Sequence, residues 1–314
     1  MEKTLFGKTR DGQDIHKITL ENGDYTFSVL TWGATLFRYG TKDVNIVLYH
    51  ESAEQYFDDS TYMGEVVGPV ANRIAKAKFS LGGNTYHLEK NNGVNTLHSG
   101  SACYGQKLWS LMGVGTSSVT LCLSTPDGLG GFPGEHEITV TYTLESDGSL
   151  IIQYRTRSDK KCPVAVTNHA YFNLSASSDI RDTILTIPAE RYVAVDDELI
   201  PTGVLSVENT DFDFRKGMRI GARRSGCYDN TFVLDQNAII KAEGDRAYLM
   251  CKTTEPGVQL YTGEFIVGDH KPFEGFCLET GRYPDTPNHD DYPKAYTSSD
   301  EEYVSITVYK MGVK

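Results

Sequence analysis

Apolar side chains alternate with polar ones in run after run of this chain, which is the period of a strand with one buried face. Residues 138–144 and residues 150–154 both follow this pattern. Asp147 and Gly148 stand between the two runs, and this pair favours the tight turn of a hairpin because glycine accepts a positive φ. The chain is therefore predicted to consist mainly of antiparallel strands.

Helical signals are few. Ser52 and Gln55 have the spacing of a capping box, which predicts one short helix near residues 52–56. No repeat of roughly 20–50 residues is visible, so a propeller or solenoid is disfavoured. No linker interrupts the strand pattern, and we expect residues 1–314 to form a single domain. The predicted fold class is all-β, a large antiparallel sandwich of big sheets.

The charge balance narrows the range of partners. The 314 residues include 30 Lys plus Arg and 42 Asp plus Glu, a formal net charge of −12. This charge repels phosphate groups, so neither nucleic acid nor an anionic membrane is expected as a partner. No apolar run approaches the ~20 residues of a membrane helix, and the N-terminal residues lack the apolar run of a signal peptide. We expect a cytoplasmic protein, and a small neutral ligand is compatible with its charge.

Familiar cofactor motifs are missing from the sequence. The glycine-rich run 128–134 lacks the G-x-G-x-x-G spacing of a dinucleotide site, and His136-Glu137 lacks the second histidine of a zinc protease. No Walker loop or G-x-S-x-G elbow is present. The scattered cysteines are expected to be reduced thiols; they are Cys103, Cys122, Cys162, Cys227, Cys251 and Cys277. A metal cofactor is not expected, although ligands from separate strands are compatible with the sequence.

Two ionisable residues stand inside strongly apolar segments. Glu279 follows the apolar run 276–278, and burial there would raise its pKa toward that of a useful general base. An ordinary salt bridge with Arg282 is the structural alternative. His169 lies in the apolar and aromatic segment 166–174. It is either a catalytic group or a core histidine bonded to the backbone.

Arg73, His98 and Asp229 are further candidates in turn-rich segments. Each has an ordinary role available. Arg73 could pair with an acid, His98 could sit in a glycine-rich turn, and Asp229 could cap a turn through an Asx bond. The residues taken singly leave both interpretations open.

Taken together, seven strings resemble motifs of the aldose 1-epimerase (galactose mutarotase) family in the family's order. No single string is decisive, but their order and spacing match across most of the chain. The strings are GPVANRI at 68–74, LHSG at 97–100, PDGLGGFPG at 126–134, TNHAYFNL at 167–174, IPTG at 200–203, GVQLYTGEF at 257–265 and CLETGRYPDTPN at 277–288.

The resemblance implies a β-supersandwich with a broad open cleft and no cofactor. It assigns Glu279 as the catalytic base and His169 as the catalytic acid. The sugar-binding residues that it implies are Arg73, His98 and Asp229, with Asn72 shaping the pocket and Tyr171 a weaker candidate for ligand contact. The implied partner is a free aldose such as D-galactose or D-glucose, and the protein would be a monomer or a homodimer.

Three positions depart from the family pattern. Gly281 stands where the family has glutamine, Pro69 precedes Val-Ala-Asn, and Ser99 replaces a glycine of the LHGG turn. Gly281 removes an amide that could contact a hydroxyl, so the substrate preference is expected to differ. None of the three removes the acid–base pair.

Interconversion of anomers requires the hemiacetal to open. One proton leaves the anomeric hydroxyl while another reaches the ring oxygen, so an acid and a base suffice. We expect Glu279 to take the first proton and a protonated His169, charged near neutral pH, to supply the second. Trp32, Trp109 or one of the tyrosines is expected to face the sugar ring.

Three alternatives remain at this stage. An epimerase of a hexose 6-phosphate or an unusual sugar would need a basic pocket, for which the motifs offer mainly Arg73 and Arg282. A non-catalytic sugar-binding protein could use the same fold. A retaining glycosidase could use Glu279 and Asp229, with carboxyl groups ~5–5.5 Å apart.

Overall fold

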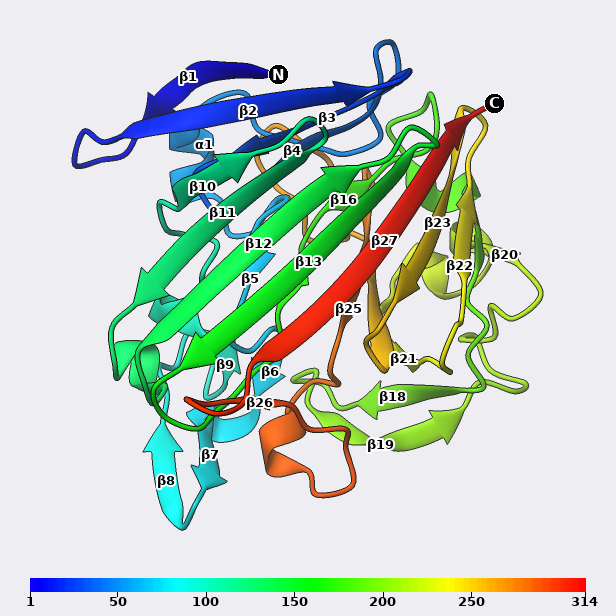
Figure 1. Cartoon of the computed structure of the whole chain (residues 1–314). Helices are drawn as coiled ribbons and strands as arrows, with labels where there is room; N and C mark the ends of the chain where they lie inside the picture. The colour runs from blue at the N-terminus through cyan, green and yellow to red at the C-terminus, as the bar shows by residue number, and fades with distance from the viewer.

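The computed structural model describes all residues from Met1 to Lys314. Its largest element is a nine-stranded antiparallel sheet, which faces the viewer in Figure 1. The strands, in spatial order, are β10 (Ser110–Val114), β11 (Ser118–Thr125), β12 (His136–Leu144), β13 (Ser149–Ser158), β27 (Tyr303–Val313), β23 (Ala247–Thr253), β22 (Ile240–Glu243), β17 (Ile184–Thr186) and β20 (Met218–Arg219).

The hairpin predicted at Asp147-Gly148 is confirmed. It joins β12 to β13, with Leu144 opposite Leu150, and Gly148 has φ +82°. Burial alternates along both strands as the sequence pattern requires. The apolar side chains therefore share one face of the sheet.

A second, six-stranded sheet lies behind the first. Its strands, in spatial order, are β16 (Tyr171–Phe172), β25 (Phe276–Gly281), β24 (Gly257–Tyr261), β21 (Asp229–Val233), β18 (Arg191–Val195) and β19 (Pro201–Ser206). One face of β25 packs on β27. The Tyr309 hydroxyl of β27 donates a hydrogen bond to the Leu278 carbonyl of β25 at 2.7 Å. Phe172 also packs on Tyr309, with ring centroids 5.0 Å apart. The opposite face of β25 is left free for other contacts.

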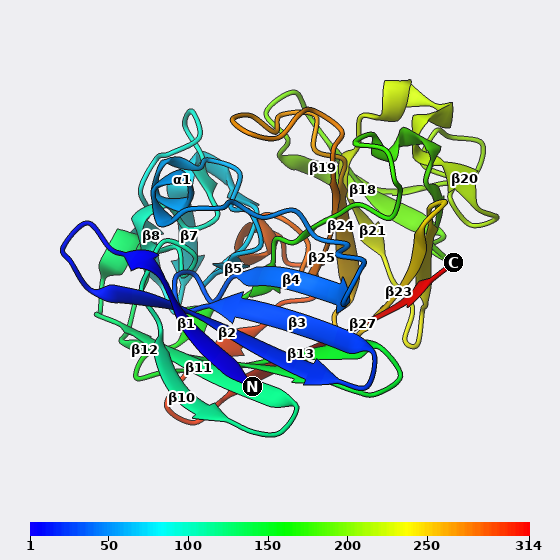
Figure 2. The ribbon, with the colours of Figure 1, turned by 90° about the horizontal axis from the view of Figure 1, so that it is seen from above.

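The remaining strands complete the all-β architecture. Figure 2 shows the N-terminal four-stranded sheet and, on the other side of the molecule, the strands of the six-stranded sheet. The four strands are β1 (Glu2–Lys8), β2 (Asp14–Asn22), β3 (Tyr25–Leu30) and β4 (Leu36–Thr41). Four two-stranded pairs are β5 (Val66–Val67) with β15 (Thr167–Asn168), β6 (Arg73–Ile74) with β9 (Thr96–Leu97), β7 (Lys78–Leu81) with β8 (Asn84–His87), and β14 (Cys162–Pro163) with β26 (Tyr296–Thr297).

One buried cluster of 51 residues joins all three large sheets. Phe27 comes from the four-stranded sheet, Val140 from the nine-stranded sheet and Phe232 from the six-stranded sheet. Contact between apolar side chains of different sheets is the main source of stability in such a sandwich. The predicted all-β fold class with large antiparallel sheets is confirmed.

Helices are short. The predicted capping box at Ser52 and Gln55 opens the single α-helix, α1 (Ala53–Asp58). The 3-10 turns are η1 (Ala75–Ala77), η2 (Gly100–Ala102), η3 (Leu129–Gly131), η4 (Ile180–Asp182), η5 (Ile220–Ala222), η6 (Arg224–Gly226) and η7 (Thr286–Asn288). None of these helices has the length and apolar character needed to span a membrane. All six cysteines are free thiols, as predicted.

Candidate active site

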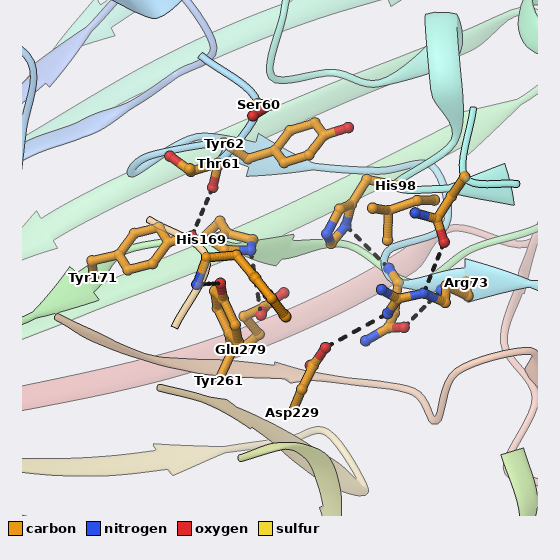
Figure 3. A pocket seen from close by; sticks show the side chains of 14 residues that line it. Ser60, Thr61, Tyr62, Arg73, His98, His169, Tyr171, Asp229, Tyr261 and Glu279 are labelled. Carbon is orange, nitrogen blue, oxygen red and sulfur yellow. Dashed lines mark hydrogen bonds and ion pairs between the residues drawn. The ribbon is translucent and has the colours of Figure 1, made fainter. Parts of the chain in front are cut away.

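A cavity of about 230 Å³ lies on the free face of the six-stranded sheet (Figure 3). It gathers the proposed acid–base pair and all of the proposed polar sugar-binding residues, together with Tyr171. These are Glu279, His169, Arg73, His98, Asp229, Asn72 and Tyr171. The remaining lining residues are Ser60, Thr61, Tyr62, Asn92, Leu97, Tyr261 and Phe265.

The period of two along β25 separates the site from the core. Phe276 and Leu278 point into the buried cluster, so Cys277 and Glu279 share the opposite face. In the neighbouring ladder Gln259 of β24 lies opposite Glu279. Asp229 of β21 lies opposite Tyr261. The floor of the cavity is therefore a rigid sheet whose apolar underside is packed.

His169 and Glu279 form a buried pair. The imidazole Nε2 lies 3.5 Å from Oε1 of the carboxyl, and both side chains are about 5% exposed. The backbone fixes the histidine, because its N–H donates to the Glu65 carbonyl at 2.9 Å and its carbonyl accepts from Gly64 N–H at 3.0 Å. A proton can therefore pass between the two groups or to a ligand bound beside them.

Burial sets the protonation of this pair. It raises the pKa of Glu279 to about 8, the negative charge of Asp229 adds to the rise and Arg73 opposes it. Burial also lowers the pKa of His169 to about 4. The prediction that His169 is charged near neutral pH is thus wrong for the sugar-free site, since the lost hydration of the ring outweighs the surrounding acidic charge. At neutral pH Glu279 is therefore protonated and His169 is a neutral imidazole, so the one proton that the pair can transfer resides on Glu279.

Arg73 and Asp229 face each other across the cavity. Arg73 Nη1 lies 3.7 Å from Asp229 Oδ2, and Arg73 Nε donates to Asn92 Oδ1 at 3.1 Å. Gln259 Nε2 donates to Asp229 Oδ1 at 2.5 Å. Arg73 does pair with an acid, but the acid belongs to the same cavity. The pair presents donors and an acceptor side by side, which suits vicinal hydroxyl groups.

Asn72 fixes the orientation of His98. The backbone N–H of Asn72 donates to His98 Nδ1 at 3.1 Å, and the backbone N–H of His98 donates to the Asn72 carbonyl at 2.9 Å. Because Nδ1 accepts a hydrogen bond, the proton of the neutral ring is assigned to Nε2. Burial, with the charges of His169 and Arg73, lowers the pKa of His98 well below its usual value. His98 therefore serves as a neutral donor.

The turn from Asp59 to Met63 forms another wall. The buried carboxylate of Asp59 accepts from Thr61 N–H at 2.7 Å and from Met63 N–H at 3.0 Å, and His50 Nε2 lies 3.4 Å away. Tyr62 between them has φ +55°. These bonds hold a strained turn in place, so that its side chains line the cavity.

The three departures from the family pattern have little effect on this geometry. Ser99 has φ +68°, and its hydroxyl donates to the Val70 carbonyl at 2.8 Å, which ties the turn to the neighbouring segment. Pro69 does not line the cavity. A Cβ on Gly281 would meet no atom within 4 Å, so this position is open space on the face that carries Glu279.

Of the aromatic residues that the sequence suggested, tyrosines line the site and the two tryptophans do not. Trp109 is buried and its Nε1 donates to the Tyr104 carbonyl at 2.9 Å, while Trp32 packs edge-on against Phe57. Neither tryptophan lines the cavity, so this expectation is wrong for both. Among the tyrosines, Tyr62, Tyr171 and Tyr261 line it, and Phe265 joins them.

Sequence reasoning missed Gln259 and Asn92, which hold Asp229 and Arg73 respectively. Gln259 lies in the GVQLYTGEF string, two residues before Tyr261, so the strand period was the available signal. The alternative role for Glu279, a salt bridge with Arg282, is not observed. Arg282 pairs with Glu255 at 3.1 Å and not with Glu279.

His98, His169 and Glu279 also lie close enough together to be considered as ligands of a metal ion. Their ligating atoms lie within 4.8 Å of one another and come from separate elements. The tautomer of His98 fits a metal poorly, because Nδ1 is engaged by Asn72 and Nε2 carries the proton. The donor set suits hydroxyl groups better than a cation.

Comparisons with known proteins show the family of the chain. The family model described as aldose 1-epimerase matches residues 16–310. Galactose mutarotase from Mus musculus is 37% identical over 99% of this chain and 98% of its own length. Aldose 1-epimerase from Escherichia coli (strain K12) is 34% identical over 96% of each chain. The crystal structure of galactose 1-epimerase from Lactobacillus acidophilus NCFM has a TM-score of 0.89 at 26% identity, covering 99% of this chain and 98% of that one.

Proposed function

The chain belongs to the aldose 1-epimerase family, and on that premise we propose that Glu279 and His169 are its acid–base pair. The chain is an isomerase that interconverts the α and β anomers of an aldose. One observation carries the assignment of the two residues. His169 Nε2 and Glu279 Oε1 lie 3.5 Å apart in a buried cavity whose other polar groups suit sugar hydroxyls.

The reaction needs one proton on the pair, placed on His169. In the sugar-free site that proton resides on Glu279, and its transfer to His169 changes no proton count. A sugar hydroxyl that donates to the Glu279 carboxylate stabilises the charged form. Binding of the anomeric hydroxyl therefore favours the reactive arrangement, with a carboxylate base and an imidazolium acid.

Ring opening then follows in a balanced step. Glu279 takes the proton of the anomeric hydroxyl, the bond between C1 and the ring oxygen breaks, and His169 donates its Nε2 proton to that oxygen. The product is the open-chain aldehyde, which rotates about the C1–C2 bond. The reverse transfers close the ring on the other face. General acid and general base contributions of ~100- to 10,000-fold each are usual for such transfers.

Arg73, His98 and Asp229 hold the sugar while this rotation occurs, and Asn72 supports two of these residues. Arg73 and the Nε2–H of His98 act as donors, and Asp229 acts as an acceptor. Each charge-assisted hydrogen bond contributes about 1.5–3 kcal/mol. Asn72 acts through its neighbours, since its Oδ1 accepts from Arg73 N–H at 2.8 Å and its own N–H orients His98.

The preferred substrate is a free hexose, D-galactose or D-glucose. The printed name of the mouse relative, galactose mutarotase, supports this choice. The ion pairs disfavour a hexose 6-phosphate, because Arg73 is engaged by Asp229 and Arg282 by Glu255. No free cation of the cavity remains to neutralise a phosphate group.

The remaining properties follow from the same proposal. The enzyme acts as one domain over residues 1–314, which the pairing of β27 with both β13 and β23 supports. It works as a monomer or homodimer in the cytoplasm, on a free sugar, with no nucleic acid or membrane partner. Six free thiols and a net charge of −12 support this setting.

Polarimetry on freshly dissolved α-D-galactose and α-D-glucose tests the proposed substrates. The protein should accelerate the approach of the optical rotation to equilibrium well beyond the rate in buffer. Both sugars relaxing at the buffer rate would rule out these substrates. A nitrophenyl glycoside should remain intact, because the pair opens a hemiacetal and does not hydrolyse a glycosidic bond.

A further inference from the structure

The second nitrogen of the His169 ring faces a thiol. Cys277 Sγ lies 3.5 Å from His169 Nδ1, and both residues are almost completely buried. Cys277 precedes Glu279 by two residues on β25, so its side chain is on the same face of the sheet. One strand therefore supplies the groups that face both nitrogens of the imidazole.

The other groups around the ring are engaged elsewhere or are too distant to replace this contact. The Tyr171 hydroxyl donates to the Thr61 carbonyl at 3.0 Å, and the Tyr261 hydroxyl accepts from Phe265 N–H at 3.0 Å. The ring centroids of His98 and Tyr62 lie 5.4 Å and 6.1 Å from that of His169. The carboxylate of Asp59 is bound within its own turn.

A thiol can serve both charge states of an imidazole. Its S–H is a weak donor and its sulfur a weak acceptor. When His169 is neutral, its remaining proton is on Nδ1 and is donated to the sulfur, which leaves Nε2 free to take a proton. When His169 is an imidazolium, Nδ1–H still donates to the sulfur and Nε2 carries the proton that the sugar receives. A carboxylate at this position would stabilise the imidazolium much more strongly and would hold the ring permanently charged.

We propose that Cys277 is a positioning residue for the epimerisation, whose sulfur accepts a hydrogen bond from Nδ1–H of His169 in both charge states and keeps Nε2 directed at Glu279 and the sugar, free to give and take a proton. This inference rests on the proposed roles of His169 and Glu279. It assigns to Cys277 no contact with the substrate. The thiol acts by keeping one tautomer of the neutral ring populated.

Substitutions at Cys277 separate this role from packing. Cys277→Ala removes the partner of Nδ1, and Cys277→Ser replaces it with another group that both donates and accepts. The matched control is Cys251→Ala, because Cys251 is equally buried but lies on β23 in the core. We expect Cys277→Ala to lower kcat by about 5- to 10-fold at unchanged KM, the loss of one hydrogen bond. Cys277→Ser should restore kcat to near the wild-type value, and Cys251→Ala should leave it unchanged.

The ¹⁵N NMR shifts of His169 give a readout independent of activity. In the sugar-free wild type and in Cys251→Ala they should report a neutral ring protonated on Nδ1, and in Cys277→Ala a mixture of tautomers. A wild-type ring protonated on Nε2, or wild-type kcat in Cys277→Ala, would overturn the inference. A Cys277→Ser variant as slow as Cys277→Ala would do so too. If His169→Asn retains activity, the proposed function itself fails, whereas an inactive His169→Asn beside a fully active Cys277→Ala refutes only the role of Cys277.

Discussion

Gln259 Nε2 lies 2.5 Å from Asp229 Oδ1, so the residue opposite Glu279 in the sheet holds the carboxylate on the far side of the cavity. This contact links the reacting end of the proposed site to its sugar-binding end. It also connects two strands, β24 and β21, whose registry fixes the distance between the groups.

Gln259→Leu should weaken sugar binding more than the chemical step. Loss of its amide leaves Asp229 with one partner fewer, and a hydrogen bond to a charged group contributes about 1.5–3 kcal/mol. We expect KM to rise about 10-fold or more, with a smaller change in kcat. Polarimetry over a range of sugar concentrations measures both. Thr231→Val is the comparison, and it should raise KM less than Gln259→Leu does, because the Thr231 hydroxyl only orients the amide of Gln259. An unchanged KM in Gln259→Leu would contradict the prediction.

Glu279→Gln and His169→Asn should each reduce kcat by ~100- to 10,000-fold, the usual scale of a general base or acid. Both changes keep the shape of the side chain and remove its proton transfer. Glu255→Gln is the control, because Glu255 is a buried carboxylate that pairs with Arg282 outside the cavity. It should lower stability without abolishing turnover. Wild-type rates in Glu279→Gln or His169→Asn would remove that residue from the mechanism.

The value of kcat/KM should depend on pH through the protonation of the sugar-free pair, because kcat/KM reports the free enzyme. As the pH rises through the pKa of Glu279, about 8, this carboxyl ionises and kcat/KM should fall. As the pH falls through the pKa of His169, about 4, the ring becomes charged while Glu279 is still protonated, and kcat/KM should fall again. Between these limits kcat/KM should be nearly constant. A pH series by polarimetry, corrected for catalysis by buffer, measures the profile.

Asp229→Asn should move the alkaline limb of this profile to lower pH. The negative charge of Asp229 helps to raise the pKa of Glu279, so its removal lowers that pKa. The exposed Asp235 provides a control, since Asp235→Asn should leave the limb in place. A limb that stays unmoved in Asp229→Asn would mean that another group titrates there.

Asp59→Asn should destabilise the protein in a pH-dependent way. Burial alone would raise the pKa of Asp59, but hydrogen bonds from His50 and from the turn outweigh it and hold the pKa below its usual value. The carboxylate therefore stabilises the fold above its unfolded pKa of ~3.9, and this contribution is lost as the pH falls through the folded pKa. We expect a loss of about 1–3 kcal/mol in the free energy of unfolding at pH 7, measured in urea.

The neighbouring Asp58 gives a matched control for Asp59. Its carboxylate is 76% exposed and pairs with the exposed Arg10. Exposed ion pairs contribute little, so Asp58→Asn should leave the free energy of unfolding within about 1 kcal/mol of wild type. Equal effects of the two substitutions would show that the bonds within the turn are not the cause.

Gly281→Gln should change substrate preference without harming the fold. Nothing lies within 4 Å of the added Cβ, and the new amide would stand two residues from Glu279 on the same face. We expect the ratio of KM for galactose to KM for glucose to shift by several-fold. Gly113→Gln is the control, because Gly113 also has open space around it but lies on β10. An equal ratio of the two KM values in the wild type, Gly281→Gln and Gly113→Gln would show that position 281 does not determine substrate preference.

Local pattern was enough to predict much of the fold. The β12–β13 hairpin follows from alternation around Asp147-Gly148, and the start of α1 follows from Ser52 and Gln55. The pairing of strands that are distant along the chain left no comparable pattern in the sequence. Nothing in the turn at Pro256-Gly257 shows that it carries the chain from the nine-stranded sheet to the six-stranded one.

At the site, too, sequence patterns located the residues but did not predict the properties that depend on packing. The family strings located Glu279, His169 and their neighbours, and all of them line one cavity. The state of His169 could not be deduced from a net charge of −12, because desolvation of one ring depends on the packing around it. The sequence could not choose between the tryptophans and the tyrosines for a related reason. Trp109 is large enough to fill the core, and only the fold shows that it does so.

The position of β27 has a consequence for how the protein is made. This strand pairs with β13 on one side and β23 on the other, and its Tyr309 supports the strand that carries Glu279. A growing chain on the ribosome therefore lacks the central strand of its largest sheet until residues 303–313 have emerged. Catalytic competence must arrive late in translation, and a nascent chain stalled before residue 303 should be inactive, however much of its sequence has already been synthesised.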